Sequence, residues 1–405
     1  MVNDKKLFYG SCFALITTAF SFSIRAGVMP QLEAELGLSA TQLGFINQMW
    51  FWGFPISMII GGLIYHKVGG AIIMQFAFFA HAVGIILTIF SGSYFVLLVS
   101  SLLIGLGNGC TEAACNPMIA DAYEGNKISK MLNRFHMWFP GGILIGSLLS
   151  QAMTSMGWSW QMQVGIILIP TVIYAYLFFG EKWPAPKSSE SSTLSGNFKT
   201  MLTPLFIFIL LCMGFTAVSE FGPNNWVPLT LKGSGATPML VMALTFGLMT
   251  VARYFGGEVV ARFSTTGVLL GSAICASLGL YLLSNQAGGM VYIAAIVYGL
   301  GIAYFWPNMI GFVARYLPES GALGMSIVGA MGMFASGLVM PIFGGLIDKN
   351  RVTAADQGLS GEALDVATGQ MTLSTMALVP LVLIVLFTIL HFWIKNRGEP
   401  SVATS

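Results

Sequence analysis

Twelve apolar stretches, each of about 20 residues, account for most of this 405-residue chain. A helix needs about that length to cross the hydrocarbon core of a bilayer. Hydrophobic residues make up 56% of the chain and charged residues 8%, whereas soluble domains carry about 25% charged residues. The composition excludes an ordinary soluble protein, and we expect an all-α polytopic membrane protein embedded in a lipid bilayer.

A polar segment divides the expected spans into two sets of six. It runs from Glu181 to Lys199 and is rich in proline, serine and charge, as interdomain linkers are. We expect an N-terminal bundle over residues 1–180 and a C-terminal bundle over 200–405. The longest outer loop, 348–370, has room for a short surface helix. The spans are expected at 8–29, 43–64, 71–91, 94–119, 131–153, 159–180, 203–222, 236–257, 265–285, 289–313, 321–346 and 371–394.

The two sets of spans carry an internal repeat. The segment Gly105–Ile119 resembles Gly299–Ile310 at an offset of 194 residues, and the pair Gly61-Gly62 matches Gly256-Gly257 at an offset of 195. A membrane chain that repeats at half its length is typical of secondary transporters, whose substrate site lies between the halves. We therefore expect two six-helix bundles related by a pseudo-twofold axis, with the glycine pairs as gating residues.

Basic residues indicate how the chain is oriented. Of the 18 lysines and arginines, most fall on one side of the expected spans, three fall on the other side, and Arg25 and Arg253 lie inside spans. Basic loops stay in the cytoplasm, so we expect both termini there, an even number of spans and a bacterial inner-membrane location. The residues on the basic side are Lys5, Lys6, Lys67, Lys127, Lys130, Arg134, Lys182, Lys187, Lys199, Arg262, Arg315, Lys395 and Arg397.

The motifs of other function classes do not occur in the sequence. There is no Gly-x-x-x-x-Gly-Lys-Ser/Thr run for an ATP-driven pump, and neither His-Glu-x-x-His nor Gly-x-Ser-x-Gly for a hydrolase. The five cysteines lie within apolar spans and are expected to be packing residues. We expect no enzyme activity, no cofactor or metal and no nucleic-acid partner, which leaves an ion gradient as the energy source.

Two spans carry polar stripes at helical spacing. Asn108, Glu112 and Asn116 lie at i, i+4 and i+8, and Glu220 and Asn224 are spaced in the same way. Ionisable groups at bilayer depth are expensive, which makes them functional candidates. Glu112 and Glu220 are the candidates for proton coupling, and the alternative for Glu112 is a hydrogen-bonded lock between helices.

The second stripe is followed by residues that suit a hydroxylated ligand. Gly222-Pro223 is expected to interrupt the span before Asn225 and Trp226. Amides and an indole provide hydrogen bonds and an apolar face for a sugar, and the alternative is the outer end of a span with Trp226 in an interfacial belt. Further candidates for substrate binding are Gln48, Asn108, Asn116, His136, Asn224, Tyr304, Trp306 and Asn308.

The two arginines inside spans have open roles. Arg25 lies near the outer end of the first span, where it either snorkels outward, pairs with a carboxylate or binds an anionic substrate. Arg253 precedes Gly256-Gly257, and we expect it to be a gating or structural residue paired with Glu258.

These residues together resemble a known family. Twelve spans, a central linker and glycine pairs before basic loops resemble the major facilitator superfamily, with Gly61–Gly70 a degenerate form of its inner-loop signature and Arg253–Gly257 a better one. Thr111–Pro117 is similar to the Glu-Thr-Ala-Ala-Asn-Pro stretch of the fucose/glucose–proton symporters. Val28–Gln31 resembles their first-span exit.

The resemblance implies that Glu112 is the substrate-coupled proton site and that Asn116 contacts a sugar. The acidic residue that the family carries in span 1 would fall near Ala26, where this chain has Arg25 instead. Glu220 is then the candidate for a second coupling carboxyl, and an uncoupled or sodium-driven carrier stays open.

The sequence thus predicts a secondary transporter that imports a small sugar or polyol with protons by alternating access between the two bundles. We expect it to act as a monomer. Two alternatives stay open: an organic-anion carrier in which Arg25 binds a carboxylate, and a membrane sensor that has kept the fold.

Overall fold

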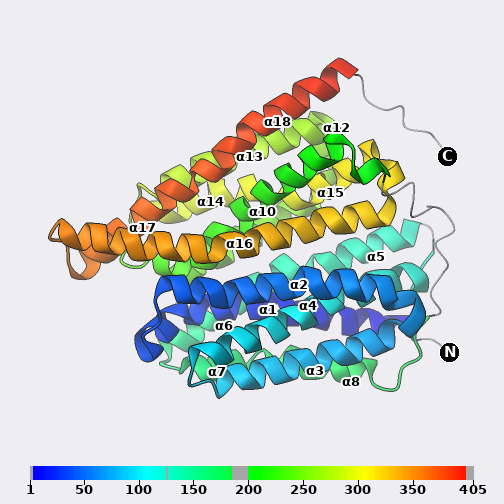
Figure 1. Cartoon of the computed structure of the whole chain (residues 1–405), viewed down its shortest axis with the longest axis horizontal. Helices are drawn as coiled ribbons and strands as arrows, with labels where there is room; N and C mark the ends of the chain where they lie inside the picture. Colours follow the sequence, from blue (N-terminus) through cyan, green and yellow to red (C-terminus); the bar gives the residue numbers. More distant parts are fainter. Residues whose placement is uncertain (1–2, 125, 185–198, 398–405) are drawn as a thin grey trace.

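The computed structural model describes residues 3–124, 126–184 and 199–397, and its elements in this part of the chain are helical. Figure 1 shows long helices lying side by side, with α1 beginning and α18 ending at the same end of the molecule. We call this end the terminal end and the opposite one the far end. The turn between α1 and α2 and the turn between α16 and α17 lie at the far end.

The first half of the chain contributes six spans. Four are single helices and two are helices divided by a short break. The elements are α1 (Asp4–Leu36), α2 (Ala40–Val68), α3 (Gly70–Ile89), α4 (Tyr94–Ala122), α5 (Asn126–His136) with α6 (Trp138–Ser155), and α7 (Trp160–Gly165) with α8 (Leu168–Phe178).

The second half contributes six more spans, of which three are divided helices. The elements are α10 (Pro204–Thr230), α11 (Pro238–Tyr254) with α12 (Gly256–Phe263), α13 (Thr265–Leu283), α14 (Met290–Ile302) with α15 (Phe305–Tyr316), the short η1 (Pro318–Ser320), α16 (Gly321–Asp356), and α17 (Gly361–Met376) with α18 (Leu378–Arg397).

Twelve spans in two bundles confirm the predicted fold class. Ten segments of the described chain are long and apolar enough to cross a membrane, and α11 is a shorter apolar helix. The remaining span is α5 with α6. The predicted linker at 181–199 stays a prediction, because residues 185–198 lie outside the described residues.

The internal repeat is visible in how the glycines pack. Gly105 of α4 lies against the backbone of Trp50 in α2, and Gly299 of α14 lies against Thr245 in α11, which is 195 residues beyond Trp50. A β-carbon at Gly105 would collide with the backbone of Trp50, and one at Gly299 would be tight against the backbone of Thr245. The same close approach between spans 2 and 4 therefore recurs between spans 8 and 10.

The two bundles are joined by polar contacts at the far end. Asp348 of α16 accepts hydrogen bonds from the backbone N–H groups of Ala40 (3.0 Å) and Thr41 (2.9 Å) and from the Thr41 hydroxyl (2.6 Å). It thereby satisfies donors at the N-terminus of α2, where an anion is favoured. Arg351 of α16 pairs with Glu33 of α1 at 2.6 Å. The interface is closed at this end.

Two expectations about irregular segments were wrong. The loop at 348–370 is mostly helical, because α16 extends to Asp356 and α17 begins at Gly361. The interruption expected at Gly222-Pro223 does not occur, since α10 continues from Pro204 to Thr230. The reason is the hydroxyl of Tyr298, which donates to Ser219 O at 2.7 Å. That carbonyl is the one that the missing N–H of Pro223 leaves without its usual donor.

Candidate functional site

Arg25 lies one turn along α1 from Phe22, whose ring contacts the second bundle, and it stacks on an aromatic ring. Its guanidinium carbon is 4.7 Å from the centre of the Trp50 ring. The indole N–H of Trp50 donates to Ser21 Oγ at 2.9 Å, which fixes the ring against α1. Arg25 is 8% exposed. A flat cation over an indole is a favourable contact, but a π face supplies no hydrogen-bond acceptor oxygen.

The guanidinium of Arg25 has no hydrogen-bond partner among the described residues. Its Nε, Nη1 and Nη2 atoms are all buried and unpaired, and no carboxylate is paired with it. Burying a charge without a partner is costly, and such charges are normally paired in proteins. Arg25 therefore carries three buried donor nitrogens that the described residues leave unpaired.

An amide pair joins the opposite bundles at Asn47, three residues along α2 from Trp50, whose ring Arg25 contacts. Asn47 of α2 donates through Nδ2 to Oδ1 of Asn225 in α10 at 2.7 Å, and the same Nδ2 lies 3.3 Å from Met29 Sδ. Both asparagines are buried, and Nδ2 of Asn225 has no hydrogen-bond partner. We call Arg25, Asn47 and Asn225 the polar layer.

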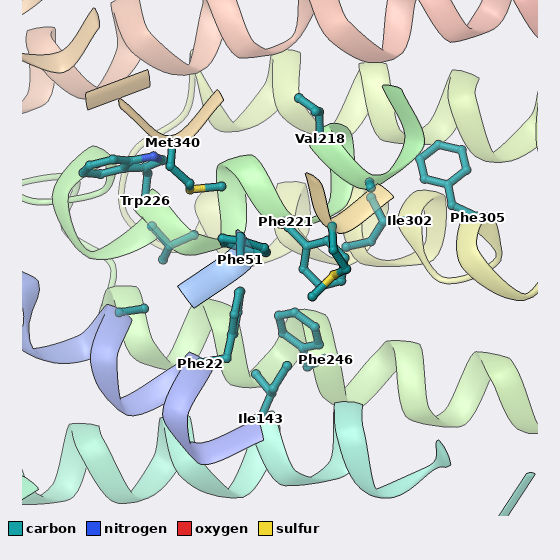
Figure 2. Close-up of a cluster of buried hydrophobic side chains, with 14 of the residues drawn as sticks. Phe22, Phe51, Ile143, Val218, Phe221, Trp226, Phe246, Ile302, Phe305 and Met340 are labelled. Atoms are coloured by element: carbon teal, nitrogen blue, oxygen red, sulfur yellow. The ribbon is translucent and has the colours of Figure 1, made fainter. Parts of the chain in front are cut away.

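A layer of phenylalanines lies one helical turn along each helix from the polar layer, toward the terminal end. Figure 2 shows the rings of Phe22, Phe51, Phe221 and Phe246 close to one another. Phe22 precedes Arg25 by three residues on α1, Phe51 follows Asn47 by four on α2, and Phe221 precedes Asn225 by four on α10. The rings contact one another: the centroid of Phe22 is 5.9 Å from that of Phe221, and that of Phe51 is 5.8 Å from it. With Phe246 of α11, 6.0 Å from Phe22, this phenylalanine layer covers the polar layer on its terminal side.

Arg253 has the partners that Arg25 lacks. Its Nη2 lies 3.4 Å from Oε1 of Glu220, and its Nε donates to Ala303 O at 3.0 Å. That carbonyl lies at the break between α14 and α15, where Pro307 has no N–H to offer it. The expected partner Glu258 was therefore wrong. Glu258 lies beyond the break at Phe255, in α12, whereas Glu220 of the adjacent α10 is in reach of Arg253.

Glu220 and Asn224 are held within the second bundle. The Asn224 amide donates to Glu220 O at 2.6 Å and to the Tyr298 hydroxyl at 3.2 Å. One oxygen of each side chain, Oε2 of Glu220 and Oδ1 of Asn224, is buried without a partner. Trp226 is fully buried and its indole N–H is also unpaired. Because Trp226 is buried, it does not belong to an interfacial belt.

Glu112, Asn116 and His136 form a connected cluster. Asn116 donates through Nδ2 to Glu112 Oε2 at 2.6 Å, and its Oδ1 lies 3.0 Å from His136 Nε2. This leaves Nδ1 of His136 4.0 Å from Glu112 Oε1. The side chain of His136 is 49% exposed and that of Glu112 is 14% exposed. The cluster thus brings a carboxylate and an imidazole close together, and the imidazole is the more exposed of the two.

Asn108, the third member of this predicted stripe, points elsewhere. Its Oδ1 lies 2.9 Å from His81 Nε2, and its Nδ2 donates to Ser21 Oγ at 3.4 Å. Ser21 in turn accepts from Trp50. Asn108 therefore supports the Trp50 ring on which Arg25 lies, inside the first bundle.

The other predicted site residues lie in the interior or at close helix contacts. Gln48 is buried in α2. Tyr304 donates to Ala252 O at 3.0 Å and Asn308 to Tyr304 O at 2.8 Å, so both are used inside the second bundle. The ring of Trp306 is 6.0 Å from that of Phe221.

The predicted gating glycines differ from one another. A side chain at Gly61 would collide with Ala113, and Gly256 lies near the Tyr304 ring. Gly62 has open space around it, and Gly257 is the second residue of α12. Their gating role stays a prediction.

Sequence reasoning missed the phenylalanine layer, and it left Asn47 open between a site residue and part of an interfacial belt. Asn47 lies next to Gln48 and one turn from Trp50, in a span whose polar and aromatic residues also fit an interfacial belt. The signal that could have identified it is shared spacing. In each of three spans a polar residue lies three or four positions from a phenylalanine, and the polar residue is always the one nearer the far end.

Two bundles of six spans with a polar layer between them define the class of two-halved membrane carriers. A model of the Major Facilitator Superfamily matches residues 11–341. The chain belongs to this superfamily.

Relatives in the superfamily include transporters of sugar acids. The chain is 21% identical to the sialic acid transporter NanX of Escherichia coli over 356 residues, which is 84% of this chain and 86% of that protein. It is 22% identical to the hexuronate transporter of Bacillus subtilis over 352 residues, 74% of this chain and 81% of that protein. With SVOPL of Mus musculus it shares 26% identity over 193 residues, and the match spans 37% of that protein's length.

Solved structures share the fold. A bacterial homolog of the human lysosomal transporter Spinster, in an inward-facing and occupied conformation, has a TM-score of 0.79 at 13% identity, covering 98% of this chain and 99% of that one. The fucose:proton symporter of E. coli has a TM-score of 0.62 at 17% identity, covering 97% and 98%. The likeness to the fucose symporter confirms the predicted fold, and at these identities it shows the fold alone.

Proposed function

We propose that this protein is a secondary transporter of a small organic anion, a sugar acid or similar hydroxylated carboxylate, and that it takes up the anion together with protons. The observation that carries the proposal is the unpaired guanidinium of Arg25. Guanidinium groups bind carboxylates through two parallel, charge-assisted hydrogen bonds, which are about twice as strong as hydrogen bonds between neutral groups. This is the anion-carrier alternative that the sequence left open, and the structure favours it over a neutral sugar.

Free amide and indole groups support the hydroxylated part of the ligand. Nδ2 of Asn225, Oδ1 of Asn224 and the indole N–H of Trp226 are buried and unpaired. Sugars offer both donors and acceptors to such groups. Two of the relatives are named for sialic acid and hexuronate, and both compounds combine a carboxylate with several hydroxyls.

The cluster of Glu112, Asn116 and His136 supports proton coupling. The carboxylate of Glu112 and the imidazole of His136 lie 4.0 Å apart and are joined through the amide of Asn116, which places two side chains able to bind protons in one connected cluster. The cluster is partly exposed whereas the side chains of the polar layer are buried, which supports the cluster as the place where the carrier gains and loses protons. Because Glu220 forms an ion pair with Arg253, we assign the proton-coupling role to Glu112.

Transport would proceed by alternating access. The far-end contacts made by Asp348 and Arg351 close one side, and we propose that this is the outer side of a bacterial inner membrane. Both termini would then be cytoplasmic, in accord with the basic residues at that end. A monomer is sufficient for this cycle, since both bundles lie in one chain.

Uptake into proteoliposomes tests the proposal. We expect a pH gradient, inside alkaline, to drive accumulation of radiolabelled glucuronate, whereas glucose is not concentrated. Glu112→Gln should abolish accumulation but leave counterflow exchange of preloaded glucuronate, because the substitution removes the proton-carrying group and keeps the shape. Accumulation of glucose but not of any carboxylate would refute the anion and restore the neutral-sugar prediction.

A further inference from the structure

The hydrogen bond between Asn47 and Asn225 joins the two bundles in the polar layer. It measures 2.7 Å and connects α2 with α10, and both side chains are buried. A buried side-chain link between bundles that move apart in each cycle is broken and remade in each cycle. The position of this hydrogen bond therefore determines which part of a bound ligand can contact it.

The link lies one turn from the Arg25 guanidinium. Arg25 and Met29 are four residues apart on α1, and Asn47 and Trp50 are three apart on α2. Arg25 contacts Trp50, and Met29 contacts Asn47. The two contacts are thus stacked along the α1–α2 seam with a separation of about 5 Å, one helical turn.

Asn225 brings a free donor to this point. Its Oδ1 is taken by Asn47, which fixes the orientation of the amide, while its Nδ2 is buried and unpaired. A buried donor without an acceptor is unfavourable. An acceptor on the ligand, one turn from the carboxylate that Arg25 holds, would satisfy it.

We propose that Asn225, oriented by Asn47, is the second contact for the ligand and selects carboxylates that carry a hydroxyl or another acceptor within about 5 Å of the carboxylate group. The proposal rests on the proposed function, because it takes Arg25 as the carboxylate site. Since Arg25 belongs to the first bundle and Asn225 to the second, the ligand joins the bundles across the polar layer.

Binding selectivity tests the proposal on the full-length protein in nanodiscs. The probes are glucuronate and cyclohexanecarboxylate, a ring carboxylate without hydroxyls. Asn225→Ala should weaken glucuronate binding about tenfold, the loss expected for one hydrogen bond in a buried site, and leave cyclohexanecarboxylate binding nearly unchanged. Thr41→Val is the matched control, because it removes another hydrogen bond between the bundles, at Asp348, away from the polar layer.

The possible results separate this proposal from the one it rests on. If both probes bind, both depend on Arg25, and Asn225→Ala leaves their affinity ratio unchanged, the role of Asn225 is overturned and the anion site stands. If neither probe binds the wild-type protein, and Arg25→Ala changes nothing, the proposed function itself fails.

A ligand-free measurement tests the geometry independently. Asn225→Asp keeps the oxygen that Asn47 uses and replaces the free Nδ2 with an anionic oxygen. If the amide lies beside the guanidinium, this substitution should raise the melting temperature of the empty protein by several degrees, and the gain should vanish in the Arg25→Ala background. A drop in melting temperature of similar size in both backgrounds would show that Asn225 does not face Arg25.

Discussion

Arg25 and Arg253 both lie inside membrane spans, and their surroundings differ in one respect. Arg253 contacts a carboxylate, Glu220, and a backbone carbonyl, Ala303 O. Arg25 contacts the face of Trp50 and leaves all three of its nitrogens unpaired. The charge of Arg253 is paired within the fold, whereas that of Arg25 has no partner among the described residues, which is why we propose a ligand for Arg25 and not for Arg253.

The difference follows from the backbone around each residue. Near Arg253, Pro307 leaves Ala303 O without a helical donor, and the guanidinium supplies one. Near Arg25 the polar side chains form hydrogen bonds with one another and not with the guanidinium. Trp50 donates to Ser21, and Asn47 donates to Asn225. The comparison suggests a criterion for arginines inside membrane spans. An arginine whose donors are all paired within the fold is a structural candidate, and one whose donors are unpaired is a functional candidate.

The largest effect on stability is expected at Arg253. Arg253→Ala should lower the free energy of unfolding by about 3 kcal/mol, since it leaves the buried carboxylate of Glu220 without its cation and Ala303 O without a donor. Thermal melting of the purified protein measures this. The double variant Arg253→Ala, Glu220→Gln should recover part of the loss. A wild-type melting curve for Arg253→Ala would show that the ion pair is not structural.

A smaller effect is expected at Tyr298, whose hydroxyl bonds the carbonyl that Pro223 leaves without a backbone donor. Tyr298→Phe removes the donor to Ser219 O and should cost about 1–2 kcal/mol, as for a buried carbonyl left unpaired. The matched test is Pro223→Ala in the same background, which restores a backbone N–H and should return much of the stability. No rescue by Pro223→Ala would mean that the hydroxyl acts through another contact.

The smallest effect isolates the carbonyl contact of Arg253. Pro307→Ala offers Ala303 O a backbone donor. It should recover about 1 kcal/mol in the Arg253→Ala background and change little when Arg253 is present. If thermal melting shows equal effects in both backgrounds, Arg253 does not act by supplying the donor that Pro307 cannot give to Ala303 O.

The spans and the two bundles could be predicted from the sequence because bilayer thickness fixes the length of an apolar helix. The repeat was equally readable, and Gly105 and Gly299 pack in matching ways. Helix breaks were harder. Gly222-Pro223 looked like an interruption, but Tyr298, some 75 residues further along the chain, repairs the helix.

The candidate site could be predicted only in part. Glu112 and Asn116 share a face because their spacing places them there, and the structure joins them to His136. The partner of Arg253 was missed because Glu220 comes from another helix. Whether Arg25 has a hydrogen-bond partner depends on every group that faces it in the folded chain. The sequence does not give these groups, so it could not choose among snorkelling, pairing with a carboxylate and binding an anion.

The most direct test compares Arg25→Ala with the wild type in two assays on the same nanodisc preparations. We expect the melting temperature of the empty protein to stay unchanged or to rise, because the substitution removes an unpaired buried charge. Glucuronate binding should fall at least 100-fold, the loss of a charge-assisted bidentate contact, and glucuronate should no longer raise the melting temperature. A large drop in the melting temperature of the empty protein, with glucuronate affinity retained, would contradict the account, since Arg25 would then be a structural residue like Arg253.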